Sequence, residues 1–376
     1  MEQHITYILK ILYYLFFSIL VYIYLKNYEI NLNNIRINFK NANILINKKF
    51  ISVITVLIFC LIFGYYGVIC GYGHDRQNYG FFFSDERYSY IVKNSSLGLY
   101  YFEKFLHIFS YNEKILFFMA SFLCSSIAFI SYFYYVEKNS KSFFYLMLSN
   151  YFIYFLFAYK QAFALAISSI SIAAFLRKDK KIFIISLLIA ICFHESAIII
   201  IPILVMIKYM KYKYFRLSLY ISIFIFAIFF KYINSYVVSF FSFIPYINVQ
   251  LKNYLDSNKN IIIDLNIFTS LKGIPYYIIT FVGLRERKEL KTKIKKYDEY
   301  LFMSIFTSFF TLISVYMYFF FRFALYFYFP VFIFATLIIN KTDKKNIKKF
   351  LKLAILFSVS LTLRYLIIVY FKYGGI

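Results

Sequence analysis

Long apolar runs separated by short basic segments make up most of this 376-residue sequence. Several runs contain about 18 or more nearly uncharged residues, the length that a helix needs to cross the hydrocarbon core of a bilayer. The first run, at about 5–25, has no small-residue cleavage site after it, so we interpret it as a retained span. The pattern predicts an all-α, polytopic helical membrane protein, with residues 1–376 forming a single integral membrane domain.

The basic segments between the apolar runs predict the orientation of the chain. Lys and Arg gather in the cytoplasmic loops of polytopic membrane proteins. We therefore expect cytoplasmic segments at about 26–49, 138–141, 177–181, 208–216, 285–296 and 341–349. This placement also explains the formal net charge of +25, so we expect no nucleic-acid partner.

The alternation of apolar and basic segments predicts about 11–12 membrane segments, with both termini on the outer side. They are expected at about 5–25, 50–70, 115–136, 143–176 as two passes, 182–207, 216–236, 263–284, 301–339 as two passes, and 350–370. The polar stretch 71–113 carries charges of both signs and an amphipathic piece at 99–106, which is typical of a helix in the interface plane. We expect this stretch to be a long periplasmic loop.

The segment 182–207 allows two interpretations. A single tilted helix would place the basic residues after 207 on the outer side, against the charge rule. Two short helices meeting at His194, Glu195 and Ser196 would keep both flanking basic segments in the cytoplasm. We prefer this broken, re-entrant form, which requires the backbone at the break to be buried in protein or to line a wet cavity.

The predicted topology brings most of the unusual polar residues to the outer side. They are Asp75, Arg76, Glu103, Lys160, Gln161, His194, Glu195, Arg322 and Arg364. Basic groups at the edge of a hydrocarbon layer suit a lipid-linked phosphate or diphosphate, and a nearby imidazole or carboxylate suits a general base. Simpler explanations exist for each residue: Lys160 and Arg322 could extend to the interface, and His194 could be a hydrogen-bonded core residue.

Motifs for metals and cofactors are missing from the sequence. There is no glycine-rich phosphate loop, no HExxH and no CxxC, and the four cysteines lie within or at the end of apolar runs. We expect no metal ion and no cofactor, and we expect the cysteines to contribute to packing.

Four strings of the sequence resemble the EpsG-like membrane proteins of exopolysaccharide synthesis, which are related in role to Wzy-type polysaccharide polymerases. The strings are GHDRQNYGFFF at 73–83, YKQAFALAI at 159–167, FHESAIIIIP at 193–202 and RFALY at 322–326. The resemblance implies a metal-independent glycosyltransferase in the bacterial cytoplasmic membrane. It would join undecaprenyl-diphosphate-linked repeat units into O-antigen, capsule or exopolysaccharide at the outer face.

The resemblance also implies roles for the candidate residues. His194, Asp75 or Glu195 would remove a proton from a sugar hydroxyl. Substrate would be bound by Arg322, Lys160, Gln161, Arg76, Glu103, Tyr326 and Arg364, with Tyr326 coming from the family's arginine–tyrosine step. Lys160 stands where the family usually has arginine, and lysine cannot make a forked contact, so more of the phosphate binding would fall to Arg322.

Two other functions compete with the polymerase. A flippase for lipid-linked oligosaccharides should show polar groups along a central path and often internal repeats. A membrane acyltransferase that modifies the polysaccharide would need polar groups near the cytoplasmic acyl donor. The expected partners are undecaprenyl-diphosphate-linked glycans, the lipid bilayer, and a chain-length regulator and flippase of the same pathway.

Overall fold

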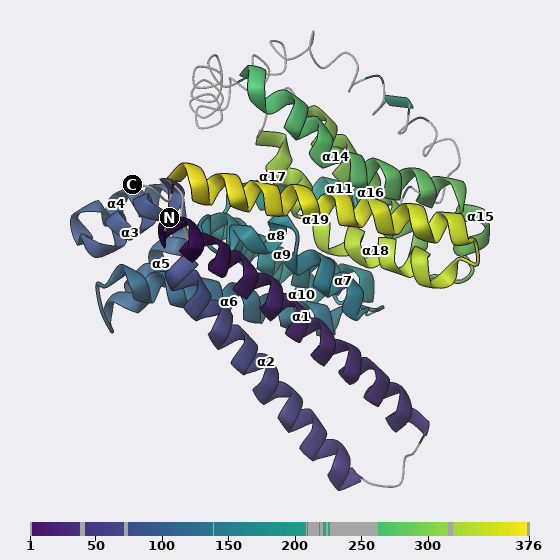
Figure 1. Cartoon of the computed structure of the whole chain (residues 1–376), viewed down its shortest axis with the longest axis horizontal. Helices are drawn as coiled ribbons and strands as arrows, with labels where there is room; N and C mark the ends of the chain where they lie inside the picture. Colours follow the sequence, from purple (N-terminus) through teal and green to yellow (C-terminus); the bar gives the residue numbers. More distant parts are fainter. Residues whose placement is uncertain are drawn as a thin grey trace.

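The computed structural model describes residues 2–37, 42–70, 74–137, 139–207, 262–314 and 319–373, with a few single positions between 209 and 225. This part of the chain folds into α-helices joined by short connections, with two 3-10 turns and no strand. Figure 1 shows the C-terminal helix running along the long axis of the molecule and the first two helices slanting away from it. The predicted all-α class is confirmed.

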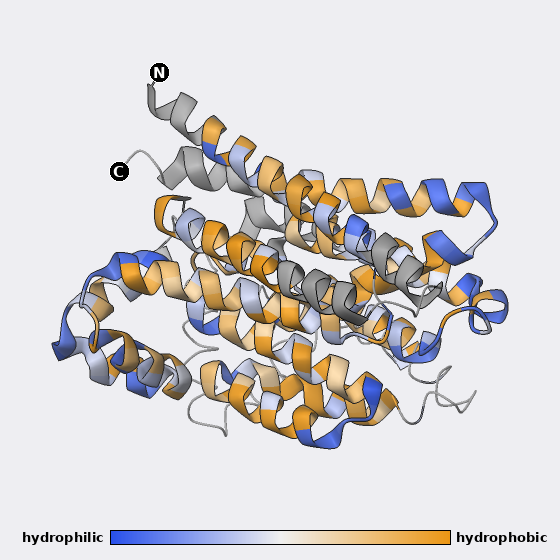
Figure 2. Ribbon diagram, turned by 90° about the horizontal axis from the view of Figure 1, so that it is seen from below, coloured by the Kyte–Doolittle hydropathy of each residue, from blue (hydrophilic) through white to orange (hydrophobic). Residues whose placement is uncertain are grey.

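Apolar residues form a band between two polar ends of the molecule. Figure 2 shows hydrophobic helices across the middle and hydrophilic residues gathered at both ends of the long axis. Three described helices are long and apolar enough to cross a membrane, at Leu9–Tyr28, Glu113–Tyr134 and Tyr159–Arg177. Shorter apolar helices lie at Val53–Ile69, Glu195–Ile207 and Tyr328–Lys341. The predicted span at 216–236 falls almost entirely outside the described residues.

The first half of the chain packs around a row of neighbouring helices. They are α1 (Glu2–Ile37), α2 (Ala42–Cys70), α6 (Glu113–Tyr134) and α9 (Tyr159–Arg177). Helix α2 lies against α6, and α6 lies against α9. Gly67 permits the close approach of α2, because a Cβ there would lie 2.2 Å from the Ser121 hydroxyl oxygen. Small residues serve this purpose in helix packing within membranes, where backbones approach closely.

The stretch 71–113 is helical where it is described. It contains α3 (His74–Ser84), η1 (Glu86–Tyr88), α4 (Ser89–Ser95) and α5 (Leu97–His107). Helix α5 covers the stretch expected at 99–106; it buries Leu99, Glu103 and Leu106, while Tyr101 and Phe105 remain exposed. The first turn of α1 and the last turns of α19 (Lys345–Tyr373) lie at the same end of the long axis as these helices (Figure 1). We call this the loop end.

The segment 143–176 does not form two equal passes. Its first part breaks into α7 (Ser140–Met147) and α8 (Asn150–Tyr154) before α9 begins. The Ser149 hydroxyl accepts a hydrogen bond from the Tyr151 amide and caps α8. Serine is favoured at such a cap and disfavoured in the interior of a helix. The expectation of two spans of about 17 residues is therefore wrong for the first span, although Lys160 does lie at the start of α9.

The segment 182–207 turns back on itself. It forms α10 (Lys180–Phe193), η2 (Glu195–Ile199) and α11 (Ile200–Ile207), with His194 in extended backbone between them. Ile184 near the start of α10 and Ile207 at the end of α11 line one pocket, so both arms reach the same end of the bundle. The broken, re-entrant form is confirmed, and the single tilted helix is excluded.

The second half of the described chain is a bundle around one fully buried helix. It consists of α14 (Ile262–Arg285), α15 (Arg287–Leu290), α16 (Tyr297–Ile313), α17 (Phe319–Leu325), α18 (Tyr328–Lys341) and α19. Helix α18 is buried from Tyr328 to Ile339. The predicted interruption of 301–339 is present, with Arg322 in the short helix α17 just before the break at residues 326–327.

Candidate functional site

A cavity of about 390 Å³ lies at the loop end of the bundle. Five of the residues expected at the outer side line it: Asp75, Lys160, Gln161, His194 and Arg322. They come from four separate parts of the chain: α3 supplies Asp75, α9 supplies Lys160 and Gln161, the break between α10 and η2 supplies His194, and α17 supplies Arg322. The structure therefore brings together residues as far apart in sequence as 75 and 322.

Interrupted helices place the polar side chains of this cavity. Lys160 and Gln161 occupy the first turn of α9, after the irregular residues 155–158, and His194 follows the last residue of α10. Helices α9 and α10 pack against each other in opposite directions, so the start of one lies beside the end of the other. Helix ends leave backbone groups without helical partners, and such ends are common places for polar sites within membranes.

Two cations share the cavity. Lys160 lies within electrostatic reach of Arg322, Asp75 and Glu195, and His194 lies within reach of both cations. The side chains of Lys160 and Arg322 are half-buried, whereas Asp75 is exposed at the side of α3. Two positive charges held this close, with one carboxylate at the rim, favour an anionic ligand in the cavity.

A chain of three side chains holds His194. The Ser196 hydroxyl lies 2.7 Å from His194 Nδ1 and 2.8 Å from the hydroxyl of Tyr326. The backbone amide of Ser196 also donates to His194 Nδ1, at 3.2 Å. Tyr326 is fully buried, so it does not reach the cavity and instead anchors the chain from behind.

These contacts determine which ring nitrogen of His194 carries a proton. An amide N–H can only donate, so Nδ1 must present its lone pair to the Ser196 amide. A neutral imidazole has one protonated nitrogen, and here that is Nε2. With Nδ1 as an acceptor, the Ser196 hydroxyl donates to His194 Nδ1, and the Tyr326 hydroxyl donates to the Ser196 oxygen. His194 thus has an N–H at Nε2 with which to donate a hydrogen bond.

The helices of the loop end are joined directly to the His194 apex. The Ser96 hydroxyl donates to the carbonyl of Phe193 at 2.7 Å and accepts from the Leu99 amide, which caps α5. Gly98 packs on the same residue, because a Cβ there would lie 2.7 Å from the Phe193 ring. Any displacement of α5 is therefore transmitted to the residue that precedes His194.

The comparison with known proteins agrees with the residues that meet in this cavity. The sequence profile of the EpsG family matches residues 48–374, which is most of the chain. The chain belongs to the EpsG family. No curated protein and no solved structure matches it. The family assignment confirms the resemblance seen in the sequence and makes this an exopolysaccharide-related membrane protein.

Glu103 of this EpsG-family chain lies beside the cavity and not in its lining. Its side chain is 3% exposed, and no hydrogen-bond partner for its Oε1 lies within the described part of the chain. Burial raises the pKa of the Glu103 carboxyl to about 8. A carboxyl group in this setting is held in its neutral form near pH 7, which suits a hydrogen-bond donor better than an anion.

Three other sequence candidates do not line the cavity. Arg76 is buried, donates to the carbonyls of Gly67 (2.6 Å) and Val68 (2.9 Å), and stacks on the Phe117 ring. Arg76 thereby caps the C-terminal end of α2, so its role in the structure is to stabilise that helix end. Glu195 is exposed just outside the cavity, and Arg364 is exposed on α19.

The sequence interpretation named Ser196 at the break but gave no role in the site to Ser196, Asn78 or Tyr79. Ser196 holds His194, while Asn78 and Tyr79 line the cavity from α3. A serine two residues after a histidine at a helix break is a local signal for Ser196, because short polar side chains at such breaks bond to neighbouring groups. Asn78 and Tyr79 follow Asp75 by one helical turn, so they share its face.

Proposed function

We propose that this protein is a polysaccharide polymerase that joins undecaprenyl-diphosphate-linked oligosaccharide repeat units at the outer face of the bacterial cytoplasmic membrane. The EpsG family supports the coarser statement that the protein serves exopolysaccharide synthesis. One observation carries the finer proposal: a single cavity combines two cations, an imidazole that carries its N–H at Nε2 and a carboxylate.

The two cations suit the leaving group. In the proposed reaction the bond between the anomeric carbon of the growing chain and its diphosphate oxygen breaks, and the electron pair stays on the diphosphate. Arg322 offers a forked pair of donors to phosphate oxygens, and Lys160 adds a point charge. Groups already positioned where negative charge develops stabilise the transition state without reorganisation.

Asp75 is the proposed general base. An incoming sugar hydroxyl attacks the anomeric carbon, and its proton passes to the Asp75 carboxylate at the rim of the cavity. His194 is a poorer base in this arrangement, because its Nδ1 lone pair is already engaged and its Nε2 is protonated. We assign the Nε2–H of His194 to a hydrogen bond with the departing diphosphate or with the acceptor sugar.

The test is polymerisation by the purified full-length protein with a synthetic undecaprenyl-diphosphate-linked repeat unit, read as a ladder on a gel. We expect Asp75→Asn and Arg322→Ala to reduce the rate by about 10² to 10⁴-fold, the span seen for loss of general acid–base or oxyanion groups. Lys114→Ala is the matched control, because Lys114 is an exposed cation at the start of α6 outside the cavity lining.

A wild-type protein that forms no ladder, yet moves the lipid-linked unit across vesicles, would replace the polymerase with a flippase. Normal ladders from both variants would remove these residues from the reaction. In cells the polymerase would receive its substrate from a flippase and would work with a chain-length regulator. The product would be O-antigen, capsule or exopolysaccharide.

A further inference from the structure

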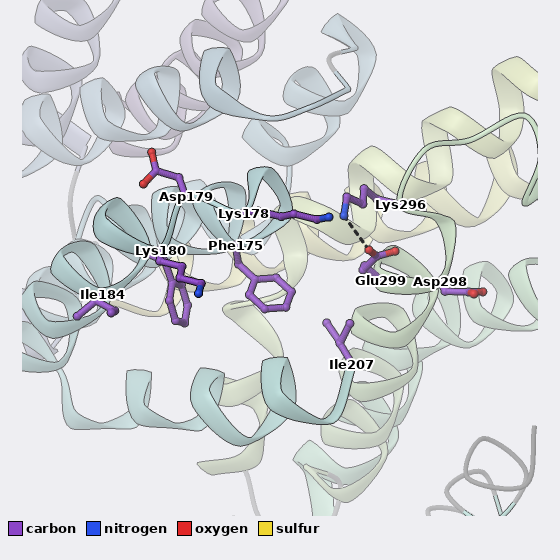
Figure 3. Close-up of a pocket in the computed structure, with 10 residues that line it drawn as sticks. Phe175, Lys178, Asp179, Lys180, Ile184, Ile207, Lys296, Asp298 and Glu299 are labelled. Atoms are coloured by element: carbon purple, nitrogen blue, oxygen red, sulfur yellow. Dashed lines mark hydrogen bonds and ion pairs between the residues drawn. The ribbon is translucent and has the colours of Figure 1, made fainter. Parts of the chain in front are cut away.

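A second and larger pocket lies at the other end of the bundle from the cavity. It has a volume of about 680 Å³ and is lined by the end of α9, the start of α10, the end of α11 and the start of α16. Figure 3 shows the side chains of Lys178 and Lys296 extending toward each other, with Phe175 and Ile207 below them. We call it the lysine pocket.

The lysine pocket lies far from the proposed reaction. Lys160 is in the first turn of α9 and Lys178 caps its last turn, so the two residues are separated by 18 helical steps. At 1.5 Å per residue this is about 27 Å, close to the thickness of the hydrocarbon core. The pocket therefore opens at the membrane face opposite the cavity, where the basic segments of the sequence predict the cytoplasm.

The lining of the lysine pocket holds three lysines and three carboxylates, and the carboxylates are engaged by other groups. Each of its three carboxylates already has partners, which are Tyr134 and the Ile182 amide for Asp179, Arg287 and Lys291 for Asp298, and Lys296 for Glu299. Among the described residues, the ammonium groups of Lys178 and Lys180 have no hydrogen-bond or ion-pair partner. A ligand that enters this pocket thus meets two lysines that make no direct contact with a carboxylate of the described chain.

Lys178 also points at another cation. Figure 3 shows its side chain extended toward Lys296, which itself contacts Glu299 at 3.1 Å. Two ammonium groups turned toward each other repel, and an anion placed between them would reverse the sign of the interaction. The arrangement is therefore more favourable with a bound anion than without one.

The backbone at both lysines adds a second, independent observation. Lys178 has φ 66° and Lys296 has φ 60°, and they are the two non-glycine residues with positive φ in the described chain. Glycine adopts this left-handed conformation more easily and is the usual residue after a helix C-terminus. The backbone conformation alone would favour glycine at both positions. The presence of lysine is therefore explained by its side chain and not by the backbone.

Apolar side chains make up the rest of the lining. Phe175, Phe183, Ile184 and Ile207 line the pocket beside the lysines, and Ile184 is 53% exposed on the outer surface of α10. A ligand suited to this lining has an anionic head and an apolar body. Basic pockets between transmembrane helices at the cytoplasmic side bind anionic lipid head groups.

We infer that the lysine pocket binds an anionic phospholipid of the cytoplasmic leaflet. The phosphate lies between Lys178 and Lys296, with Lys180 at the rim. The upper parts of the acyl chains run along Phe183, Ile184 and Ile207. This lipid site is separate from the proposed polymerase reaction, since it occupies the other end of α9 and shares no residue with the cavity.

The test uses the purified full-length protein in detergent, titrated with phosphatidylglycerol or phosphatidylcholine. Bound lipid is counted by native mass spectrometry, and stabilisation is followed by thermal unfolding, because a ligand of the folded state raises the melting temperature. We expect the wild type to prefer phosphatidylglycerol. Lys178→Gly should weaken that binding about ten-fold, the cost of one charge-assisted contact, without disturbing the helix cap.

Two control variants make the test specific. Lys178→Arg keeps the charge and should retain binding, and Lys181→Ala removes a neighbouring exposed lysine that does not line the pocket. Should Lys178→Gly fold poorly, Lys178→Gln removes the charge at nearly constant size. Wild-type affinity in the folded neutral variants, or equal binding of both lipids by the wild type, would overturn the inference. Equal stabilisation by glycerol phosphate would show a site for free phosphate and not for lipid.

Discussion

Replacing Tyr326 by phenylalanine tests whether the buried tyrosine acts through His194. The change removes only the hydroxyl that lies 2.8 Å from the Ser196 oxygen, and it leaves the ring in a fully buried site. Ser196 keeps its hydrogen bond with His194 Nδ1, so the imidazole is held less firmly but stays in place. A direct contact of Tyr326 with substrate is excluded by its burial, so any loss of rate must pass along this chain.

The size of the effect follows from one hydrogen bond. A typical intramolecular hydrogen bond contributes about 0.5–1.5 kcal/mol. If all of it serves to orient His194 in the transition state, the rate falls about two- to twelve-fold, since about 1.4 kcal/mol corresponds to a factor of ten. We expect His194→Gln to cost more, about 10² to 10³-fold, because it removes the positioned ring N–H that donates to the substrate.

The assay is the initial rate of polymerisation by purified variants, combined in a double-mutant cycle. In the His194→Gln background the further change Tyr326→Phe should have almost no effect, because its route to the reaction is already lost. Tyr151→Phe is the matched control: its buried hydroxyl donates to the Leu165 carbonyl at 3.0 Å and has no contact with His194. That variant should lose stability but keep the rate.

An equal loss of rate from Tyr326→Phe in both backgrounds would refute this reasoning. So would a loss as large as that of Arg322→Ala in a protein that melts at the wild-type temperature. Either result would mean that Tyr326 affects the reaction by a route other than the chain through Ser196.

Three further predictions concern single residues around the cavity. Arg322→Lys should lose most polymerisation, since lysine cannot make the forked contact with phosphate; wild-type chain lengths at equal expression would contradict this. Gly98→Ala should destabilise the protein by about 1–3 kcal/mol, because the new Cβ would lie 2.7 Å from the Phe193 ring, and Phe193→Leu should restore much of that loss in thermal melting. Glu103 binds a proton more tightly in the folded state, so wild-type stability should fall between about pH 4.5 and about pH 8, the range from its usual pKa to the raised one. Glu103→Gln should flatten this part of the melting profile, and an unchanged slope would show that another group titrates.

The charge pattern of the sequence was sufficient to predict the re-entrant hairpin. Basic residues on both sides of 182–207 require both ends on one side of the membrane, and only a turn near His194 achieves this. The same rule placed Lys160, His194 and Arg322 at one end, and the cavity holds all three. Long-range placement was predictable here because the membrane reduces the topology to a choice between two sides.

The roles of individual side chains were harder to predict. Arg76 stands beside Asp75 in the sequence, yet its guanidinium binds carbonyls at the end of α2, which depends on where two helix ends meet in space. Tyr326 was expected to bind substrate, but it is buried behind the cavity. The first pass of 143–176 also differed, since apolar periodicity does not reveal a break that a serine cap creates at Ser149.

The small volume of the cavity has a kinetic consequence. A space of about 390 Å³ is at the lower end of the range for pockets that hold drug-sized ligands, so on the proposed reaction it would hold the reacting ends of two glycans and not a polymer. Such a cavity cannot measure how long the chain has become. On the proposed reaction, the length distribution then follows from the competition between adding a unit and releasing the chain at each cycle. A variant that slows addition while release is unchanged should shorten the whole distribution and leave the linkage between sugars the same.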